Sequence, residues 1–340
     1  MDKEIVNKIS EELDPTDKQK KRMFNQILVN RQNKQTKPSP TRLKPKLVAA
    51  LIACCLITTT AIAATFIGLD TKFLNFLNPS SEQQIKHLAN GASTVEKKIK
   101  NKNGTLHINQ VIGDSNLVYI LMDFTAPEGT VLDKARYRFE DSDIRSIQGF
   151  QGIGFTKLDD KHAEDNQISM MMRLKTRESL MGQKIKLKLS DLQAADPFPG
   201  IFKTVIPGEW KTSFTLDFKD YSTVYDLDKP ITLFDHAATL KSVSISPISV
   251  TIIVETPFVE EISKAHGWME EVGLDEYLDN LPITINYTDG SSETTTIFNG
   301  MYVADTLKEE LFIMKTFENV INDKEIESIV FFDTVIPVDQ

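Results

Sequence analysis

Cysteine is almost missing from this chain of 340 residues. Cys54 and Cys55 are the only two, and both lie in a hydrophobic run near the N-terminus. Everything after Cys55 must therefore fold without disulfides, and a region of that length has enough chain to bury a hydrophobic core on its own. The first 46 residues contain neither cysteine nor histidine, which excludes a zinc-bound fold of the Cys/His type there.

The motifs that mark common enzymes are missing as well. The chain has no Gly-x-Ser-x-Gly, no His-Glu-x-x-His and no glycine loop that opens a helix. The glycines of GFQGIGF (149–155) lack a following helix signal, so they favour a turn or a bulge. The five histidines are isolated in sequence and show no metal-ligand spacing. We therefore predict no catalytic residue, no cofactor and no metal.

One long uncharged run is present, Leu47–Leu69. From Leu47 to Ile67 it has 21 residues, and about 20 helical residues cross the hydrocarbon core of a membrane. The run predicts a transmembrane helix over residues 47–69.

Two processing sites inside this run give alternatives. Leu51-Ile52-Ala53-Cys54 matches the lipobox of bacterial lipoproteins, but only four apolar residues of the run precede it. Ala61-Ile62-Ala63 matches a signal-peptidase site, but 46 residues precede the run, whereas a whole secretory signal is typically about 15–30 residues. These lengths favour an uncleaved anchor over cleavage at either site.

The charges on the two sides of the run predict its orientation. Residues 1–46 contain 12 Lys/Arg and 6 Asp/Glu, so the N-terminus is expected in the cytoplasm and residues 70–340 outside the cell membrane. The exterior part has 27 basic and 42 acidic residues. Such an acidic surface argues against nucleic acid or an anionic surface as a partner.

The cytoplasmic tail, residues 1–46, predicts two short amphipathic helices and a basic linker. The second helix begins near Pro15 and places Met23, Phe24, Ile27 and Leu28 on one face. This apolar face has two interpretations. It lies on the inner membrane surface with help from the neighbouring lysines, or it docks on a cytosolic protein.

The exterior changes from a helical to a strand-like pattern. Residues 70–98 predict helices, with a restart at Ser80-Ser81-Glu82 after Pro79. From Gly104 onward, short alternating runs such as LVYILMDF, KIKLKL and SVTIIVE predict antiparallel strands. Trp210 alternates with apolar neighbours, which predicts a core position.

The strand-like region also contains an internal duplication. Residues 106–127 and 240–257 each read as two strands around a polar turn, closed by proline after a threonine. Further along, Lys175-Thr176 aligns with Lys315-Thr316 in the same order. The fold class predicted is a mainly β exterior of two tandem antiparallel β-sandwich-like modules, 104–224 and 225–340, after a helical connector over 70–103.

One segment of the second module breaks the strand rhythm. Residues 259–280 predict one or two short helices with seven acids and a single lysine, Lys264. The first interpretation is a solvated acidic face with Ile262, Trp268 and Met269 packed inward. The second is a recognition surface centred on Trp268 and Met269.

Three stretches of the chain resemble a known family. They are the tail stretch DPTDKQKKRMFNQIL (14–28) and the exterior stretches LDTKFLNFLNPSSEQQIKHLANGA (69–92) and QVIGDSNLVYILMDFTAPEGTVLD (110–133). They resemble single-pass membrane proteins of Gram-positive bacteria that are described as anti-sigma factors. In that family a domain of unknown function outside the membrane is often followed by an immunoglobulin-like module. The resemblance covers roughly residues 10–340.

The resemblance implies that the tail holds an extracytoplasmic-function sigma factor inactive and that the exterior senses a condition outside the cell. The chain departs from many such proteins because its tail lacks their His and Cys-x-x-Cys zinc motif. We therefore predict a single-pass regulatory membrane protein without enzymatic activity. The alternative is a structural, adhesive or ligand-binding exterior that the N-terminus merely anchors.

Overall fold

The computed structural model describes residues 68–145, 150–158, 165–196, 200–265, 282–295, 301–317, 319–322, 325–331 and 334–338. All of them belong to one compact unit, Ile62–Gln340. The predicted tail and all but the last two residues of the predicted transmembrane helix lie outside the described residues. Within the described part, no helix is both long and apolar enough to cross a membrane.

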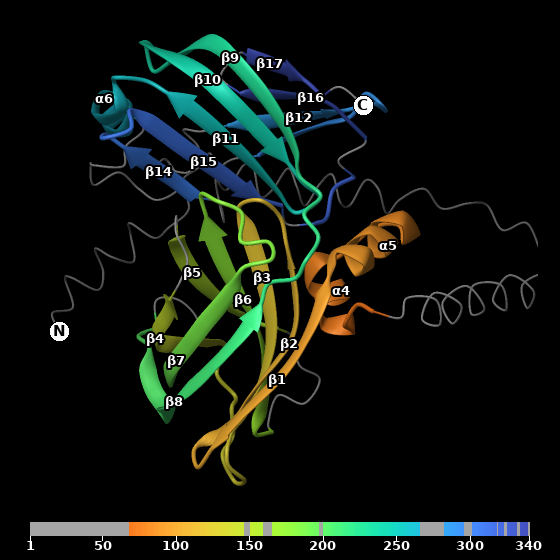
Figure 1. Ribbon diagram of the computed structural model, residues 1–340, viewed down its shortest axis with the longest axis vertical. Helices are drawn as coiled ribbons and strands as arrows, with labels where there is room; N and C mark the ends of the chain where they lie inside the picture. The colour runs from red at the N-terminus through yellow and green to blue at the C-terminus, as the bar shows by residue number, and fades with distance from the viewer. Residues whose placement is uncertain are drawn as a thin grey trace, which may run out of the picture. The chain divides into compact units, whose positions relative to one another are not determined.

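The described residues are mainly β, as predicted, and the strands pair antiparallel in four sheets (Figure 1). Two sheets form what we call the first module. Its larger sheet has the order β1-β2-β3-β6-β5 and contains β1 (Ser93–Asn101), β2 (Gly104–Gly113), β3 (Leu117–Thr125), β5 (Phe150–Lys157) and β6 (Gln167–Thr176). Its smaller sheet has the order β4-β7-β8 and contains β4 (Arg136–Arg145), β7 (Lys184–Ala195) and β8 (Lys203–Thr215).

The other two sheets form the second module. Its larger sheet has the order β14-β15-β11-β10-β9 and contains β9 (Thr223–Leu233), β10 (His236–Ile245), β11 (Ser249–Glu255), β14 (Met301–Asp305) and β15 (Glu310–Thr316). Its smaller sheet has the order β13-β12-β16-β17 and contains β12 (Ile283–Tyr287), β13 (Ser292–Thr295), β16 (Ile326–Phe331) and β17 (Thr334–Pro337). Three helices complete the described elements: α4 (Thr71–Leu77), α5 (Glu82–Gly91) and α6 (Val259–Ala265).

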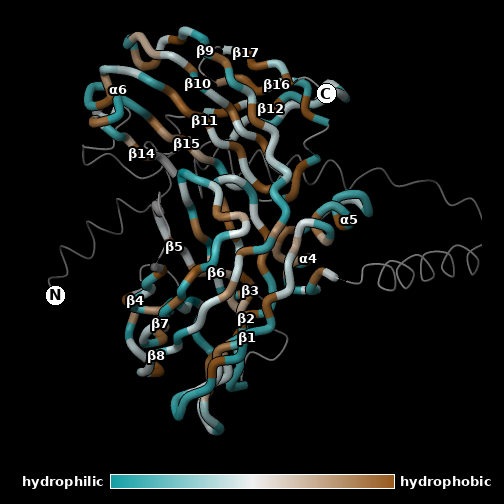
Figure 2. Tube along the Cα trace, in the orientation of Figure 1, coloured by the Kyte–Doolittle hydropathy of each residue, from teal (hydrophilic) through white to brown (hydrophobic). Residues whose placement is uncertain are grey.

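Each module has its own hydrophobic core, to which both of its sheets contribute. The alternation of apolar and polar residues along strands such as β7 supplies one face to the core and the other to solvent (Figure 2). The predicted core position of Trp210 is confirmed. The tryptophan is 1% exposed and meets Phe124 and Phe139 edge-on at ring-centre distances of 5.0 and 5.8 Å.

The larger sheets of the two modules share one strand order, as the predicted duplication requires. Each consists of three consecutive strands followed by the fourth and fifth in reversed order. The second strand of each sheet has a bulge at the equivalent place, around Asn109 in β2 and Lys241 in β10. The predicted alignment of Lys175-Thr176, at the end of β6, with Lys315-Thr316, at the end of β15, was wrong by one residue. The hydrogen-bond register matches Lys175 with Thr316, not with Lys315, and a one-residue shift reverses the face on which a side chain lies.

The predicted helical connector over 70–103 is also partly wrong. Its helices end at Gly91, and β1 then pairs with β2, so the first module begins before residue 104. The signal for this hairpin is Asn103-Gly104 at the turn, where Gly104 has φ +140. A side chain could not replace it easily, because a Cβ would lie 2.7 Å from the Thr125 carbonyl oxygen. The join between modules falls in residues 216–222, since β8 ends at Thr215 and β9 begins at Thr223, so the predicted boundary between residues 224 and 225 lies just inside the second module.

Candidate functional site

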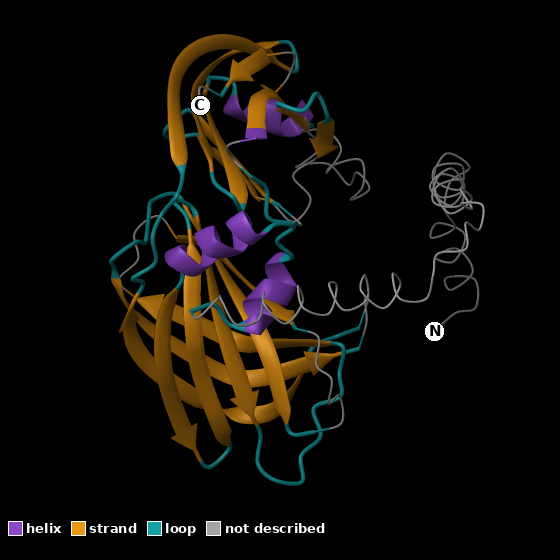
Figure 3. Ribbon diagram, turned by 90° about the vertical axis from the view of Figure 1, so that its right-hand side faces the viewer, coloured by secondary structure: helices purple, strands orange, loops and turns teal. Residues whose placement is uncertain are grey.

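The connector helices α4 and α5 are built into a third hydrophobic core, which we call the junction core. In sequence α4 follows the predicted membrane span directly, and both helices lie against the strands of the first module (Figure 3). Four elements contribute side chains to this core: the two helices, the face of the larger first-module sheet that points away from its own core, and the second module. Its buried members are Leu69, Phe73, Leu77, Leu88, Ile112, Leu117, Tyr119, Leu121, Leu158, Met171, Ile248, Phe312, Met314 and Val320.

Local sequence signals fix where the two helices begin. Asp70 caps α4, its side chain accepting from the amide of Lys72, and Ser81 caps α5 by accepting from the amide of Gln84. Between them Asn78 adopts a left-handed conformation that ends α4 before Pro79. The predicted helix restart at Ser80-Ser81-Glu82 is therefore confirmed.

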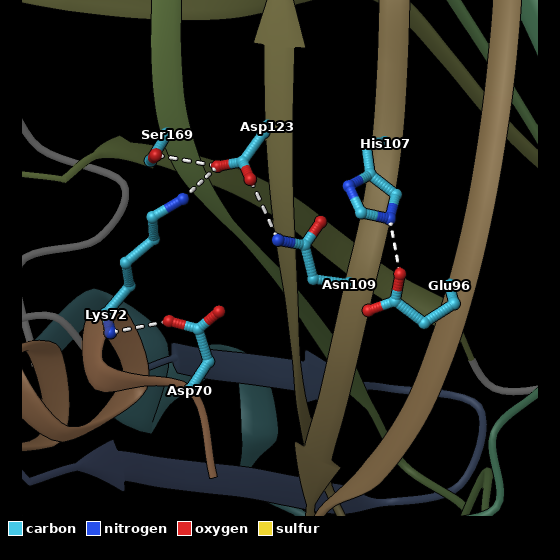
Figure 4. Close-up of polar contacts among 7 residues, drawn as sticks. All are labelled: Asp70, Lys72, Glu96, His107, Asn109, Asp123 and Ser169. Atoms are coloured by element: carbon cyan, nitrogen blue, oxygen red, sulfur yellow. Dashed lines mark hydrogen bonds and ion pairs between the residues drawn. The ribbon is translucent and has the colours of Figure 1, made fainter.

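An ion pair holds α4 on the first module (Figure 4). Lys72 Nζ lies 2.6 Å from Oδ1 of Asp123 on β3, and the same carboxylate accepts from Ser169 Oγ at 2.6 Å and Asn109 Nδ2 at 2.8 Å. Burial alone would raise the pKa of Asp123, but these hydrogen bonds and the Lys72 charge outweigh it and lower the pKa. The carboxylate thus stays ionised and can anchor Lys72.

The first described residues are held in the same way. The side chain of Gln110, which is 7% exposed, accepts from the amide of Asp70 at 2.8 Å and donates to the carbonyl of Gly68 at 2.6 Å. The last two residues of the predicted membrane span therefore belong to the exterior, because Gly68 is bonded to β2 and Leu69 is buried in the junction core. The predicted end of the span was too late by two residues, and no free linker lies between Gly68 and the sheet.

The second module also contacts the connector. The Val320 amide donates to the Leu77 carbonyl at 3.0 Å, and Gln84 Nε2 donates to the Val320 carbonyl at 3.0 Å. Asn78 Nδ2 adds a bond of 2.8 Å to Asn319 Oδ1. Both modules thus position α4 and α5.

A buried carboxylate joins the two modules directly. Asp114, 2% exposed, lies in the β2–β3 turn, where its Oδ1 accepts from the amides of Asn116 and Leu117. Its Oδ2 accepts from Ser246 Oγ at 2.5 Å and Ser249 Oγ at 2.6 Å. These serines belong to the β10–β11 turn, the equivalent turn of the second module. Burial raises the pKa of Asp114, although these four hydrogen bonds oppose the shift.

Charged side chains also lie between the modules. Arg177 Nη1 lies 2.8 Å from Glu310 and 3.3 Å from Asp305, and its guanidinium lies over the ring of Phe312. Lys175 lies two residues earlier, near the end of β6. Burial lowers its pKa to about 8, with help from the charges of Arg173 and Lys315.

Two clefts border the connector. One of about 320 Å³ lies between α5 and the second module and includes Gln84, His87 and Val320. Another of about 350 Å³ includes Phe76 of α4, Tyr119 and Arg173 of the first module, and Phe317 of the second. Both are large enough for a small molecule, so the junction offers room for a ligand that contacts both modules.

The residues predicted as sites lie elsewhere. Met23, Phe24, Ile27 and Leu28 of the tail are outside the described residues, as are Trp268 and Met269. Helix α6 confirms the start of the predicted helical insertion, and Ile262 on it is buried as expected. Among described residues no three His, Cys, Asp or Glu side chains are grouped to hold a metal.

Sequence analysis missed Asp114 and Asp123. The first had a local signal, because Asp-Ser-Asn between two strands is typical of a turn in which aspartate accepts from following amides. Asp123 had no local signal, because its hydrogen-bond partners lie 14 to 51 residues away in sequence.

Comparisons with known proteins give no family. No family model matches the chain, and no curated protein sequence matches it. Among solved structures it is similar to the crystal structure of the conserved domain protein from Bacillus anthracis, with 14% identity, 70% of this chain and 75% of that chain covered, and a TM-score of 0.46. It also matches the N-terminal periplasmic domain of ScsB from Proteus mirabilis, with 11% identity, 72% and 96% covered, and a TM-score of 0.22. Likenesses at these TM-scores carry no argument about fold or function.

The Asp114 contact predicts different outcomes for two substitutions. Asp114→Asn keeps the shape, since its amide can accept from the backbone and donate to the serines, and should change stability little. Asp114→Ala leaves the amides of Asn116 and Leu117 and the hydroxyl of Ser249 without the partner that Asp114 supplies, whereas Ser246 keeps its bonds within its own turn. At about 1–3 kcal/mol for each group that stays buried, we expect a loss of at least about 3 kcal/mol. Urea unfolding of Ile62–Gln340 measures both, and equal stabilities would contradict the assignment.

Lys175 predicts a pH dependence. Because its folded pKa is lowered from 10.5 to about 8, its stabilising contribution is complete above the ordinary value and is lost as pH falls through about 8. Lys175→Met should therefore be more stable than wild type at pH 7 and lack the rise in unfolding free energy between pH 8 and 10. Lys184→Met, which removes an exposed charge, is the control and should keep the rise. A rise of unchanged size in Lys175→Met would disprove this role.

Proposed function

We propose that this protein is a membrane-anchored regulator of the anti-sigma type. The uncharged run from Leu47 to Ile67 spans the cell membrane, since Gly68 and Leu69 at its predicted end are held by the exterior. The tail binds an extracytoplasmic-function sigma factor through Met23, Phe24, Ile27 and Leu28. The exterior, two β-sandwich-like modules of which the second is immunoglobulin-like, senses a condition outside the cell. The resemblance of the tail and exterior stretches to such proteins supplies this hypothesis.

The observation that best supports the proposal is the junction core. An exterior that is only tethered needs no more than a flexible linker after its anchor. Here Gly68, Asp70 and Lys72 are bonded to the first module, and Leu77 and Gln84 to the second. Phe73 and Leu77 are buried, and each such side chain contributes about 1.5–3 kcal/mol. A change in how the modules meet would therefore act on the chain where it leaves the membrane.

A second candidate is a ligand-binding exterior that the N-terminus merely anchors. The observation in its favour is a row of exposed lysines on the β1–β2 hairpin, Lys97, Lys98, Lys100 and Lys102. Such a row suits attachment to an anionic polymer outside the cell. This candidate requires nothing of the tail beyond anchoring.

A double substitution in the tail separates the two candidates. Phe24→Asp with Leu28→Asp places two charges on the apolar face and should abolish capture of the sigma factor. Its target genes should then be transcribed constitutively, while the anchor still inserts because its sequence is unchanged. Transcript profiling of cells with the substituted chain measures this.

The matched control adds the same charge to the opposite helix face, Asn25→Asp with Gln26→Asp, and should leave transcription repressed. If both double variants and wild type give one transcript profile with the sigma factor present, the tail does not act through this face.

A further inference from the structure

The acidity of the exterior is confined to one of its modules. Residues 223–340 contain 22 acidic and six basic residues, whereas residues 93–222 contain 18 acidic and 19 basic residues. The basic residues of the first module therefore belong to a region without net negative charge. Local groups of cations there are not cancelled by the overall charge of the chain.

One such group lines a cleft at the edge of the first module. The cleft has a volume of about 460 Å³ and lies where edge strand β4 of the smaller sheet meets edge strand β5 of the larger. Arg136 and Arg138 come from β4, Lys157 from β5, and Phe202 from the segment before β8. The described residues that line the cleft include no aspartate or glutamate.

Among the described residues, the hydrogen-bond partners of the three cations are all neutral groups. Arg136 donates from Nε to the Asp196 carbonyl at 3.0 Å and from Nη2 to the Gly200 carbonyl at 2.6 Å. Arg138 donates from Nε to Gln193 Oε1 at 2.9 Å. Lys157 Nζ donates to the Lys134 carbonyl at 3.0 Å. By contrast, Lys72 of α4 and the first-module residues Lys134, Lys188 and Arg177 all pair with carboxylates.

Aromatic rings hold these cations in place. The guanidinium carbons of Arg136 and Arg138 lie 4.9 and 4.2 Å from the ring centre of Phe202, and Lys157 Nζ lies 5.4 Å from that of Tyr137. Contact with a ring face favours a cation without neutralising it. Arg138 thus keeps both terminal nitrogens without a hydrogen-bond partner in the described chain, ready for bidentate contact with an oxyanion.

The wall opposite β4 includes Gly154 of β5, which lines the cleft with backbone only. The predicted bulge at GFQGIGF is confirmed, since the β5–β6 register shifts between Phe150 and Gly152. Bulges of this kind commonly redirect a strand edge next to a binding site.

We propose that this cleft binds a phosphate-bearing anion. Three cations around one cleft suit a ligand with at least two negative charges, which a single carboxylate does not supply. The planar fork of Arg138 matches a phosphate group bidentately, and Lys157 adds a point charge. The volume accommodates more than one phosphate unit, so a chain of phosphate groups fits better than a lone ion.

Calorimetric titration of the full chain in a neutral detergent with inorganic tripolyphosphate tests this. We expect saturable binding that weakens as salt is raised. Arg138→Gln should weaken binding about tenfold or more, because a charge-assisted bidentate contact is lost. Lys157→Gln should weaken it by a smaller factor. Lys186→Gln, an exposed charge on β7 outside the cleft, is the control and should bind as wild type does.

Two further probes define the ligand. Short-chain phosphatidic acid, whose phosphomonoester can carry two negative charges, would place the phosphate on a lipid headgroup if it bound with the same dependence on Arg138 while tripolyphosphate did not. Citrate binding as tightly as tripolyphosphate would overturn the assignment to phosphate. No binding of any phosphate probe, or equal losses in Arg138→Gln and Lys186→Gln, would overturn the site itself.

Discussion

The fold depends on a buried carboxylate that two turns share. Asp114 organises the β2–β3 turn of the first module through backbone amides and then accepts from both serines of the equivalent turn in the second. Taking a carboxylate out of water is costly unless all its oxygens are bonded, and here four donors satisfy it. This contact lies beside the junction core, whose members Leu117 and Ile248 flank the two turns. The modules therefore meet in one specific arrangement, and the connector helices pack against that arrangement.

The regulatory proposal depends on this arrangement of the modules. A signal from outside can reach the tail only if some element has two arrangements that a ligand or stress favours unequally. The contact between modules can supply such an element, because it includes the mutually repelling cations Lys175, Arg173 and Lys315. The clefts beside α4 and α5 give a ligand access to it. The phosphate-binding cleft lies at another edge of the first module and depends on a separate set of residues.

Local patterns predicted much of this structure from sequence. The alternation of apolar and polar residues predicted the strands. Pro79 and the serines after it predicted the break between α4 and α5, and two similar strand pairs predicted the duplication. Predictions failed where a distant partner decides the outcome. Residues 93–101 were predicted as part of a helical connector, but their hydrogen bonds to β2 make them a strand. The alignment of Lys175 with Lys315 followed residue identity, whereas the register follows backbone bonds. The Lys72–Asp123 pair joins residues 51 positions apart, which no local pattern indicates.

The central claim is that the second module stabilises the connector through the junction core. Amide hydrogen exchange in two variants of Ile62–Gln340 tests it directly. Phe312→Ala empties a position of the junction core, whereas Phe331→Ala empties one of the second module's own core, and both side chains are at most 1% exposed. Phe312→Ala should accelerate exchange of the Asn78, Ile85 and Ala92 amides, which close turns of α4 and α5. Phe331→Ala should accelerate exchange mainly within the second module. Unchanged protection of α4 and α5 in Phe312→Ala would contradict the account.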